Sequence, residues 1–378
     1  MVLERTRRAR LAVLLALLAV TAGWGAWVRV VEPLRRPRFD GWWALAHGVT
    51  VERVGLPEPE VTLLVARVPR GAGLRLRAVL LSPDRADLDL LGPAARSAGA
   101  LVAVNGDYHR LTGSFCLGAP FSTLVDRGEA RVVGAPFSYG CALWLDREGV
   151  TRIGHVDLGA ALRLPSGRTL PVQVDVETGD DLLITRPPAG VWRADGFAAL
   201  PLERTGAATF RVAGLPTTDL RGPALLRRGG LDAAFLADAA PRTTLTFERA
   251  GADADRVWLA LGTGPRLLEA GEVAAVLDAP ESPGWTARVA RTAVGLTPTH
   301  LVLASTYQLP GHGASLVDLA LALKALGCTD ALNLDGGPSS TFWAGGRVLN
   351  GDDGDDEGAA VGTALLVLPP AAGELGLR

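Results

Sequence analysis

Hydrophobic residues fall in short runs along most of the chain, and polar residues, glycine and proline separate these runs. Residues 61–66 form an almost unbroken apolar run, whereas residues 74–80 alternate leucine, alanine or valine with arginine. Short runs and alternation of this kind are typical of β-strands. The pattern therefore predicts a body built mostly of strands.

Helical spacing is rarer in this sequence. Residues 87–97 form one candidate helix, and residues 315–326 form a clearer one, with apolar positions recurring on one face. Ser315 can cap the start of that helix, Asp318 lies in its first turn, and Gly327 follows its end. We expect a mixed α/β or α+β fold with a strand-rich core and few helices.

The first 40 residues have a different pattern. The uncharged stretch 11–28 follows four arginines, approaches the roughly 20 apolar residues that span a bilayer, and ends in tryptophans suited to a membrane interface. We expect residues 1–10 to form a cytoplasmic basic end, 11–28 a transmembrane signal anchor and 29–40 a linker. The alternative is a cleaved signal peptide. Both interpretations place the body outside the cytoplasm, in the periplasm or at the cell surface.

Composition narrows the class of protein. Hydrophobic residues make up 48% and charged residues 21%, as in a folded globular protein, and the net charge of -2 argues against a nucleic-acid partner. The three cysteines lack zinc-site spacing, although Cys116 and Cys141 could pair in an exported protein, with Cys328 buried. We expect one domain over residues 41–370, in which residues 150–255 could form an inserted subdomain.

Three segments group residues that could carry chemistry. Asn105–His109 follows an apolar run and presents amide, carboxylate, phenol and imidazole groups in one turn, although Asn-Gly-Asp is also an ordinary turn sequence. In Leu332–Thr341, Asn333 and Asp335 alternate with leucines and so could share one face of a strand end. Arg291 opens a short apolar strand and could bind phosphate or carboxylate, or could be an ordinary solvated arginine.

The loop after Asp335 adds a possible anion site. Gly336 and Gly337 allow the backbone to approach a ligand closely, and their N–H groups could form an anion-binding nest. The segment is not a Walker loop, because the lysine is absent, and it lacks the spacing of a nucleophile elbow. A further glycine-rich segment, Leu261–Leu268, indicates only a turn into a strand.

Taken in chain order, these motifs resemble the phosphodiester glycosidase family over about residues 60–368. That family includes an enzyme that uncovers mannose 6-phosphate by removing N-acetylglucosamine, and bacterial proteins linked to exopolysaccharide. The resemblance implies an exported hydrolase that cleaves a sugar 1-phosphodiester or related glycan linkage in cell-envelope or exopolysaccharide metabolism. Its partners would be a carbohydrate or sugar-phosphate substrate and, through the N-terminal helix, the membrane.

The resemblance and the residue types suggest roles at the site. Arg291 would bind the phosphate with help from the glycine N–H groups, Asp335 would act as nucleophile or general base, and Asp107 would be the second carboxylate. His109 or His312 is an alternative acid or base. The expected substrate-binding residues, with Asn105 and Asn333 contacting sugar hydroxyls, are Asn105, Gly106, His109, Thr292, Asn333, Gly336, Gly337 and Ser339.

Two departures keep other functions open. Residues 303–308 contain no acid where many family members carry Asp-Gly, and His109 stands where phenylalanine is usual. The missing acid favours the rival interpretation, a non-catalytic carbohydrate-binding or scaffold protein of the cell envelope. Asp107 and Asp335 could alternatively hold a divalent cation. The acidic stretch 352–357 does not fit the EF-hand pattern and is typical of a solvated loop.

Overall fold

The computed structural model describes residues 41–84, 87–111, 118–132, 141–174, 182–185, 190–206, 208–278, 283–307, 312–351 and 356–378. The predicted anchor and linker, Cys116 and most of the acidic stretch 352–357 lie outside these ranges. The pairing of Cys116 with Cys141 therefore stays a prediction. None of the helices in the described ranges is long and apolar enough to cross a membrane.

Strands dominate the described chain, which confirms the predicted strand-rich fold with few helices. The α-helices there are α2 (Leu91–Ala98), α3 (Ala233–Asp238), α4 (Pro283–Thr286) and α5 (Leu316–Ala325). Helix α5 begins as predicted, because the Ser315 hydroxyl accepts the Asp318 N–H while the Asp318 carboxylate accepts the Ser315 N–H. Helix α2 starts later than predicted, because Asp89–Leu90 form strand β5, which pairs with β26 (Ala360–Val361).

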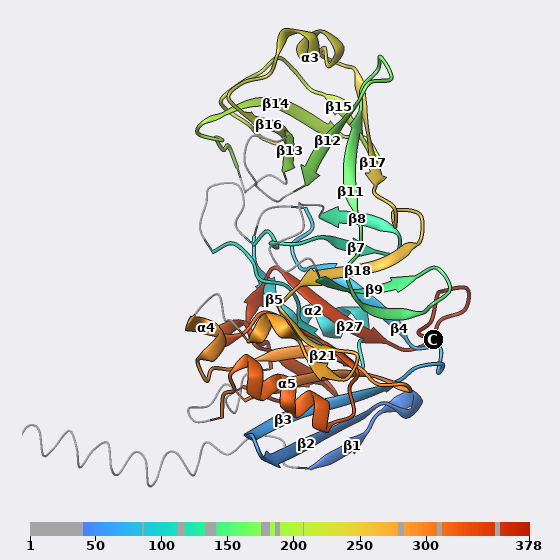
Figure 1. The fold of residues 1–378 in the computed structure, drawn as a ribbon. Coiled ribbons are helices and arrows are strands. Elements are labelled where there is room, and N and C mark those ends of the chain that lie inside the picture. The colour runs from blue at the N-terminus through green and yellow to red at the C-terminus, as the bar shows by residue number, and fades with distance from the viewer. Residues whose placement is uncertain are drawn as a thin grey trace, which may run out of the picture.

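The largest sheet has eight strands in the order β1-β2-β3-β22-β21-β23-β19-β20, and all neighbours in it are antiparallel. Helix α5 covers one of its faces with the predicted apolar stripe, burying Leu319 and Leu323 against Leu63 of β3 (Figure 1). The strands are β1 (Trp42–Ala44), β2 (Thr50–Pro57), β3 (Glu60–Pro69), β19 (Arg266–Glu269), β20 (Glu272–Val273), β21 (Thr292–Leu296), β22 (His300–Thr306) and β23 (Asp330–Asn333).

Two five-stranded sheets complete the main body. One runs β25-β24-β6-β27-β4 and the other β10-β9-β18-β7-β8, and a single apolar core joins both to the large sheet. Their strands are β4 (Arg75–Leu80), β6 (Val102–Asn105), β7 (Leu124–Asp126), β8 (Glu129–Val132), β9 (Cys141–Asp146), β10 (Thr151–Gly154), β18 (Val257–Thr263), β24 (Phe342–Ala344), β25 (Arg347–Val348) and β27 (Thr363–Leu368).

A closed barrel is inserted between β10 and β18, and it stands at the end of the molecule remote from α5 (Figure 1). It has its own core around Leu162, Phe210 and Leu245. It lies inside the range 150–255, where the sequence suggests a subdomain. In sheet order its strands are β11 (Gly159–Arg163), β12 (Thr169–Val174), β13 (Leu182–Thr185), β16 (Ala224–Arg228), β14 (Phe197–Arg204), β15 (Thr209–Val212) and β17 (Thr244–Ala250).

Candidate active site

The turn after β6 and the loop after β23 are joined directly. The Asn105 side-chain amide donates to the Asp335 carbonyl at 2.8 Å, and the Asp335 N–H donates to the Gly106 carbonyl at 2.9 Å. A Cβ at Gly106 would lie 2.5 Å from the Thr363 hydroxyl, so only glycine fits there. The fold therefore brings together two motifs that are remote in the sequence.

Asn105 also ties in the arginine strand. Its Oδ1 accepts hydrogen bonds from the Thr292 hydroxyl at 2.8 Å and the Thr341 N–H at 3.0 Å, and both Asn105 and Thr292 are fully buried. The contacts of these two side chains with a substrate stay predictions. Through these bonds both residues position the loops that surround the site.

Asn333 plays a similar part. Its Nδ2 donates to the Tyr108 hydroxyl at 2.6 Å and to the Gly264 carbonyl at 3.1 Å, and the residue is fully buried. The residue thus fixes the Tyr108 ring and the turn before β19. Its Oδ1 has no hydrogen-bond partner among the described residues, and its expected contact with a sugar hydroxyl stays a prediction. Asparagine serves equally well as a sugar ligand and as a buried cross-link, so the sequence alone does not separate these roles.

His109 and Asp335 form a close pair. Nδ1 of His109 lies 3.6 Å from Oδ2 of Asp335, and both side chains are largely buried. Burial lowers the pKa of His109, while the Asp335 charge acts in the opposite direction. Burial raises the pKa of Asp335, and the Ser339 hydroxyl, His109 and the Gly336 N–H oppose that rise. An imidazole and a carboxyl group that share a site can exchange one proton.

Asp107 is the second acid at this site. It is 2% exposed, and its Oδ2 accepts the Ser122 N–H at 2.7 Å. Burial raises the pKa of Asp107 to about 8; the Ser122 N–H and the nearby Thr263 and Ser122 hydroxyls lower it in part, whereas the Asp335 charge raises it. Asp107 is therefore mostly protonated at neutral pH.

Arg291 is a buried cation that faces the Asp335 loop. Its Nε donates to the Ala314 carbonyl at 3.0 Å, and its Nη2 donates to the carbonyls of Ala287, at 2.9 Å, and Gly284. In the described ranges no carboxylate pairs with Arg291, which is 5% exposed, and burial lowers the pKa of its guanidinium. A buried charge without a counter-ion favours the binding of an anion.

The two glycines of the loop act differently from the prediction. The Gly336 N–H donates to Asp335 Oδ1 at 2.8 Å and the Gly337 N–H donates to the Ala290 carbonyl at 2.7 Å. Neither N–H is free for an anion, so the predicted anion-binding nest is wrong. What Gly336 provides is space: a Cβ there would lie 3.6 Å from Arg291 Nη1 and 3.0 Å from the Ala290 carbonyl oxygen.

Sequence reasoning missed the polar frame behind Arg291. The Ser305 hydroxyl donates to the Arg291 carbonyl at 3.0 Å, and Thr306 Oγ1 accepts the Arg291 N–H at 2.8 Å. Asn350 is fully buried and donates to Ser305 Oγ at 3.2 Å and to the Ser340 carbonyl at 3.0 Å. The stretch that lacks the family's acid therefore holds the arginine strand in place. Asn350 gave no signal, because it stands in an ordinary Asn-Gly turn.

The described structure places His312 against Tyr307. Its ring packs edge-on against Tyr307, with centroids 6.0 Å apart. Among the described residues, no three His, Cys, Asp or Glu side chains are arranged to hold a metal ion. Of the two histidines that the sequence offered as acid or base, the structure places His109 beside Asp335.

Comparison with known proteins bears on this arrangement. Residues 221–368 match the family model described as phosphodiester glycosidase. The resemblance to that family is confirmed. Arg291 and Asp335 lie inside the matched range, whereas the turn that carries Asp107 and His109 precedes it. No curated protein sequence matches the chain.

Solved structures share the fold. A hypothetical protein from Synechocystis is 22% identical, with a TM-score of 0.67 over 84% of this chain, and the chain spans 62% of that protein's length. An exported protein from Burkholderia pseudomallei is 21% identical, with a TM-score of 0.62. The match covers 85% of this chain and 75% of that protein's chain. A zebrafish N-acetylglucosamine-1-phosphodiester alpha-N-acetylglucosaminidase domain is 12% identical, with a TM-score of 0.46. The match covers 88% of this chain and 85% of that domain, and the likeness is too low to inform function.

Proposed function

We propose that this protein is a glycosidase that hydrolyses a sugar 1-phosphodiester or a related glycan linkage. The observation that carries the proposal is Arg291, a buried guanidinium without a carboxylate partner in the described structure, next to the loop that carries Asp335. A phosphodiester would supply the missing negative charge. The family match over residues 221–368 supports the same substrate class.

Arg291 would bind the substrate through a non-bridging phosphate oxygen. Three backbone carbonyls hold its Nε and Nη2, so the guanidinium is fixed before the substrate arrives. Such a preorganised cation stabilises the negative charge that grows on the departing phosphate when the bond from the anomeric carbon to oxygen breaks.

Asp335 would act at the anomeric carbon, either as nucleophile or as the base that activates a water molecule. In the second case the water oxygen bonds to the anomeric carbon, and its proton passes to Asp335, which His109 assists at 3.6 Å. The products are the free sugar and a phosphate monoester. Asp107, protonated at neutral pH, would donate a proton to the leaving oxygen, although a departing phosphate needs little such help.

The cellular role is part of this proposal. The arginine-rich end and the apolar stretch 11–28 support export and tethering at the membrane. Together with the family's link to exopolysaccharide, this favours a role in cell-envelope or exopolysaccharide metabolism, in the periplasm or at the cell surface.

The test is hydrolysis of a nitrophenyl sugar phosphodiester by the wild type and by Asp335→Asn. We expect Asp335→Asn to lower kcat at least about a hundredfold, as loss of a catalytic carboxylate does. Asp219→Asn, which changes an exposed carboxylate on the barrel, is the matched control and should keep wild-type rates. Equal rates for wild type and Asp335→Asn would exclude Asp335 from the chemistry. Binding of the substrate without turnover by the wild type would favour the non-catalytic carbohydrate-binding alternative.

A further inference from the structure

One outer face of the main body carries apolar side chains that the core does not cover. On helix α5, Val317 and Leu321 lie one turn apart and remain 41% and 40% exposed. The opposite side of the same helix buries Leu316, Leu319 and Leu323 against the large sheet. A surface helix normally presents polar residues to water on its outer side. The outer side of α5 is therefore a candidate contact surface.

Segments next to α5 enlarge this apolar surface. Val289 is 38% exposed and pairs with Ala314, which directly precedes the start of α5. Val276 is 37% exposed in the 3₁₀ turn η3 (Ala275–Leu277), whose Leu277 packs in the same core as α5. The name α5 face is used below for the side chains of Val276, Val289, Val317 and Leu321.

The charged side chains beside the α5 face are paired. Lys324 Nζ lies 2.7 Å from Glu272 Oε2, and Arg288 Nη1 lies 2.5 Å from Asp318 Oδ2. Each pair cancels its own charge, so these four residues give the face no net charge. The apolar side chains therefore decide what the face can bind.

Strand β1 adds an exposed tryptophan on the same side of the large sheet. Trp43 packs against the main core, so its neighbour Trp42 points to the opposite side, which α5 covers, and is 59% exposed there. Trp42 pairs with Glu52, whose carboxylate accepts a hydrogen bond from Arg67 Nε at 2.8 Å. Arg67 Nη1 in turn donates to the Leu326 carbonyl, at the end of α5, at 3.5 Å. Trp42 and α5 are thus connected along one side of the sheet.

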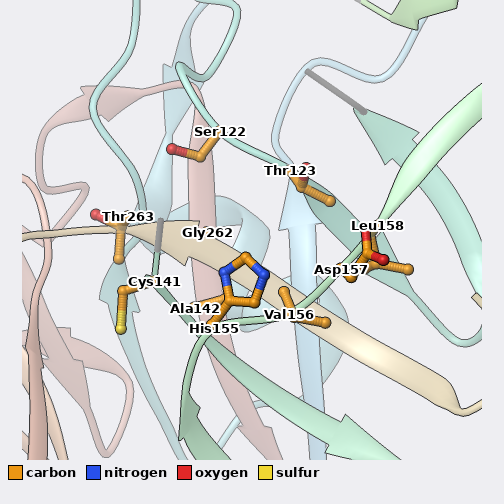
Figure 2. Close-up of a pocket in the computed structure, with 10 residues that line it drawn as sticks. All are labelled: Ser122, Thr123, Cys141, Ala142, His155, Val156, Asp157, Leu158, Gly262 and Thr263. Atoms are coloured by element: carbon orange, nitrogen blue, oxygen red, sulfur yellow. The ribbon is translucent and has the colours of Figure 1, made fainter. Parts of the chain in front are cut away.

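The hollow near Ser122 contrasts with this open surface. It lies between the segment of Ser122 and Thr123, strand β18 and the chain that enters β11 (Figure 2). It holds about 70 Å³, which is room for a few water molecules. A large partner cannot enter it and has to contact an outer surface such as the α5 face.

The chain that precedes Trp42 indicates which partner covers this side of the sheet. The apolar stretch 11–28, which we propose lies in a membrane, is joined to β1 by residues 29–40. Twelve extended residues reach at most about 45 Å, so a bilayer that holds the stretch stays within that distance of Trp42. Residues 29–40 contain four arginines and two acids, and this excess of positive charge is attracted to anionic lipid head groups. An exposed tryptophan such as Trp42 suits the interface of a bilayer with water.

We propose that the α5 face and Trp42 rest on the surface of an anionic lipid bilayer, the same bilayer that holds residues 11–28. This inference rests on the membrane tethering in the proposed function and adds to it a fixed orientation of the folded body. A few apolar side chains bind a bilayer weakly, but the tether keeps them at an effective concentration in the millimolar range, so weak contact is enough. The barrel, at the end of the molecule remote from α5, then lies away from the bilayer (Figure 1).

The experiment attaches a nitroxide spin label to the full chain in nanodiscs of phosphatidylcholine and phosphatidylglycerol. Leu321→Cys places the label on the α5 face, and Leu215→Cys, the matched control, places it on the barrel, where Leu215 is 72% exposed. Both variants also carry Cys116→Ala, Cys141→Ala and Cys328→Ala, so that the label has one site. Thermal unfolding verifies that each variant is folded.

Electron paramagnetic resonance then measures how often the label collides with oxygen, which concentrates in lipid, and with a water-soluble nickel chelate. The ratio of the two collision rates should be at least about fivefold higher at Leu321 than at Leu215, because the α5 face enters the lipid surface. Hydroxyl-radical footprinting of the wild type needs no substitution. Transfer from detergent to nanodiscs should reduce the oxidation of Val317 and Leu321 and leave that of Leu215 unchanged.

The outcomes separate this inference from the proposed function. If the chain enters the nanodiscs but the two labels collide alike with both reagents, the docking is overturned, even where the nitrophenyl phosphodiester is hydrolysed. If the chain does not enter the nanodiscs, the docking and the tethering fail together, and the hydrolysis assay still decides the enzymatic proposal. Dipolar broadening between labels at Leu321, absent at Leu215, would assign the face to a second copy of the chain and also overturn the docking. If the Leu321 label enters the lipid and no phosphodiester is hydrolysed, the docking holds and the hydrolase proposal fails.

Discussion

The side-chain amide of Asn105 donates a 2.8 Å hydrogen bond to the backbone carbonyl of Asp335. This bond joins the end of β6 to the loop after β23, and the same side chain accepts bonds from Thr292 and Thr341. One buried amide thus sets the position of the proposed catalytic carboxylate relative to the arginine strand. The architecture of the site depends on this cross-link as much as on the reactive groups.

Replacement of Asn105 should therefore reduce both stability and activity. Asn105→Ala removes three hydrogen bonds and leaves buried partners unsatisfied, so we expect a loss of about 3 kcal/mol in the free energy of unfolding. Urea denaturation measures this loss, and kcat on the nitrophenyl phosphodiester should fall because Asp335 is displaced. Thr292→Ser keeps the hydroxyl that donates to Asn105 and should stay within about 1 kcal/mol of the wild type. An Asn105→Ala variant with wild-type stability and kcat would contradict the positioning role.

Arg291→Lys should weaken binding of the anionic part of the substrate. Lysine keeps the charge but cannot reproduce the planar contacts with the Ala314, Ala287 and Gly284 carbonyls. We expect kcat/KM for the phosphodiester to fall about a hundredfold, equivalent to about 2.7 kcal/mol. Inorganic phosphate should raise the Tm of the wild type more than that of the variant. Arg193→Lys, on the barrel surface, is the control, and equal phosphate effects in all three proteins would remove Arg291 from anion binding.

Asp107 should make stability depend on pH. Its pKa is raised from about 4 in the unfolded chain to about 8 in the folded protein, so between these values the folded state binds a proton that the unfolded state has lost. Stability should therefore decrease as pH rises from about 4 to about 8 and level off above that, with a total cost on the order of a few kcal/mol.

The variant Asp107→Asn provides the test of that dependence. Asparagine carries no charge at any pH. The free energy of unfolding of the variant should therefore fall less steeply than that of the wild type between about pH 4 and pH 8, and at pH 8 it should exceed the wild-type value. Parallel curves for the two proteins, measured by urea denaturation at intervals of pH, would show that Asp107 titrates as it does in water. Activity of the variant should be lower at neutral pH, because the proton donor is missing.

The two loop glycines should respond differently to alanine. At Gly336 a Cβ would press on the Ala290 carbonyl at 3.0 Å beside Arg291, so Gly336→Ala should chiefly raise KM for the phosphodiester. Gly337 has a φ of +59° and no atom within 4 Å of an added Cβ, so Gly337→Ala should chiefly cost about 1 kcal/mol of stability. Steady-state kinetics and thermal unfolding of both variants distinguish the effects, and identical behaviour would refute the spatial role of Gly336.

Local features of this protein follow from the sequence itself. Ser315 and Asp318 lie three residues apart, so their capping box and the start of α5 could be predicted without knowledge of the fold. The alternation in residues 74–80 likewise corresponds to β4, paired along its length with β27. The order of the motifs was enough to indicate the family that residues 221–368 match. The capping box and the alternation depend on residues a few positions apart, which the chain alone brings close together.

The roles of the site residues were decided by tertiary structure. Asparagine, glycine and arginine have the same chemical groups whether they meet a substrate or a neighbouring strand, and only the fold shows which partner is present. It directs the amide of Asn105 to Asp335 and the N–H of Gly337 to Ala290, and it leaves Arg291 buried with no carboxylate partner in the described structure. Burial and most of this pairing arise between segments that are tens to hundreds of residues apart, so no local pattern could reveal them.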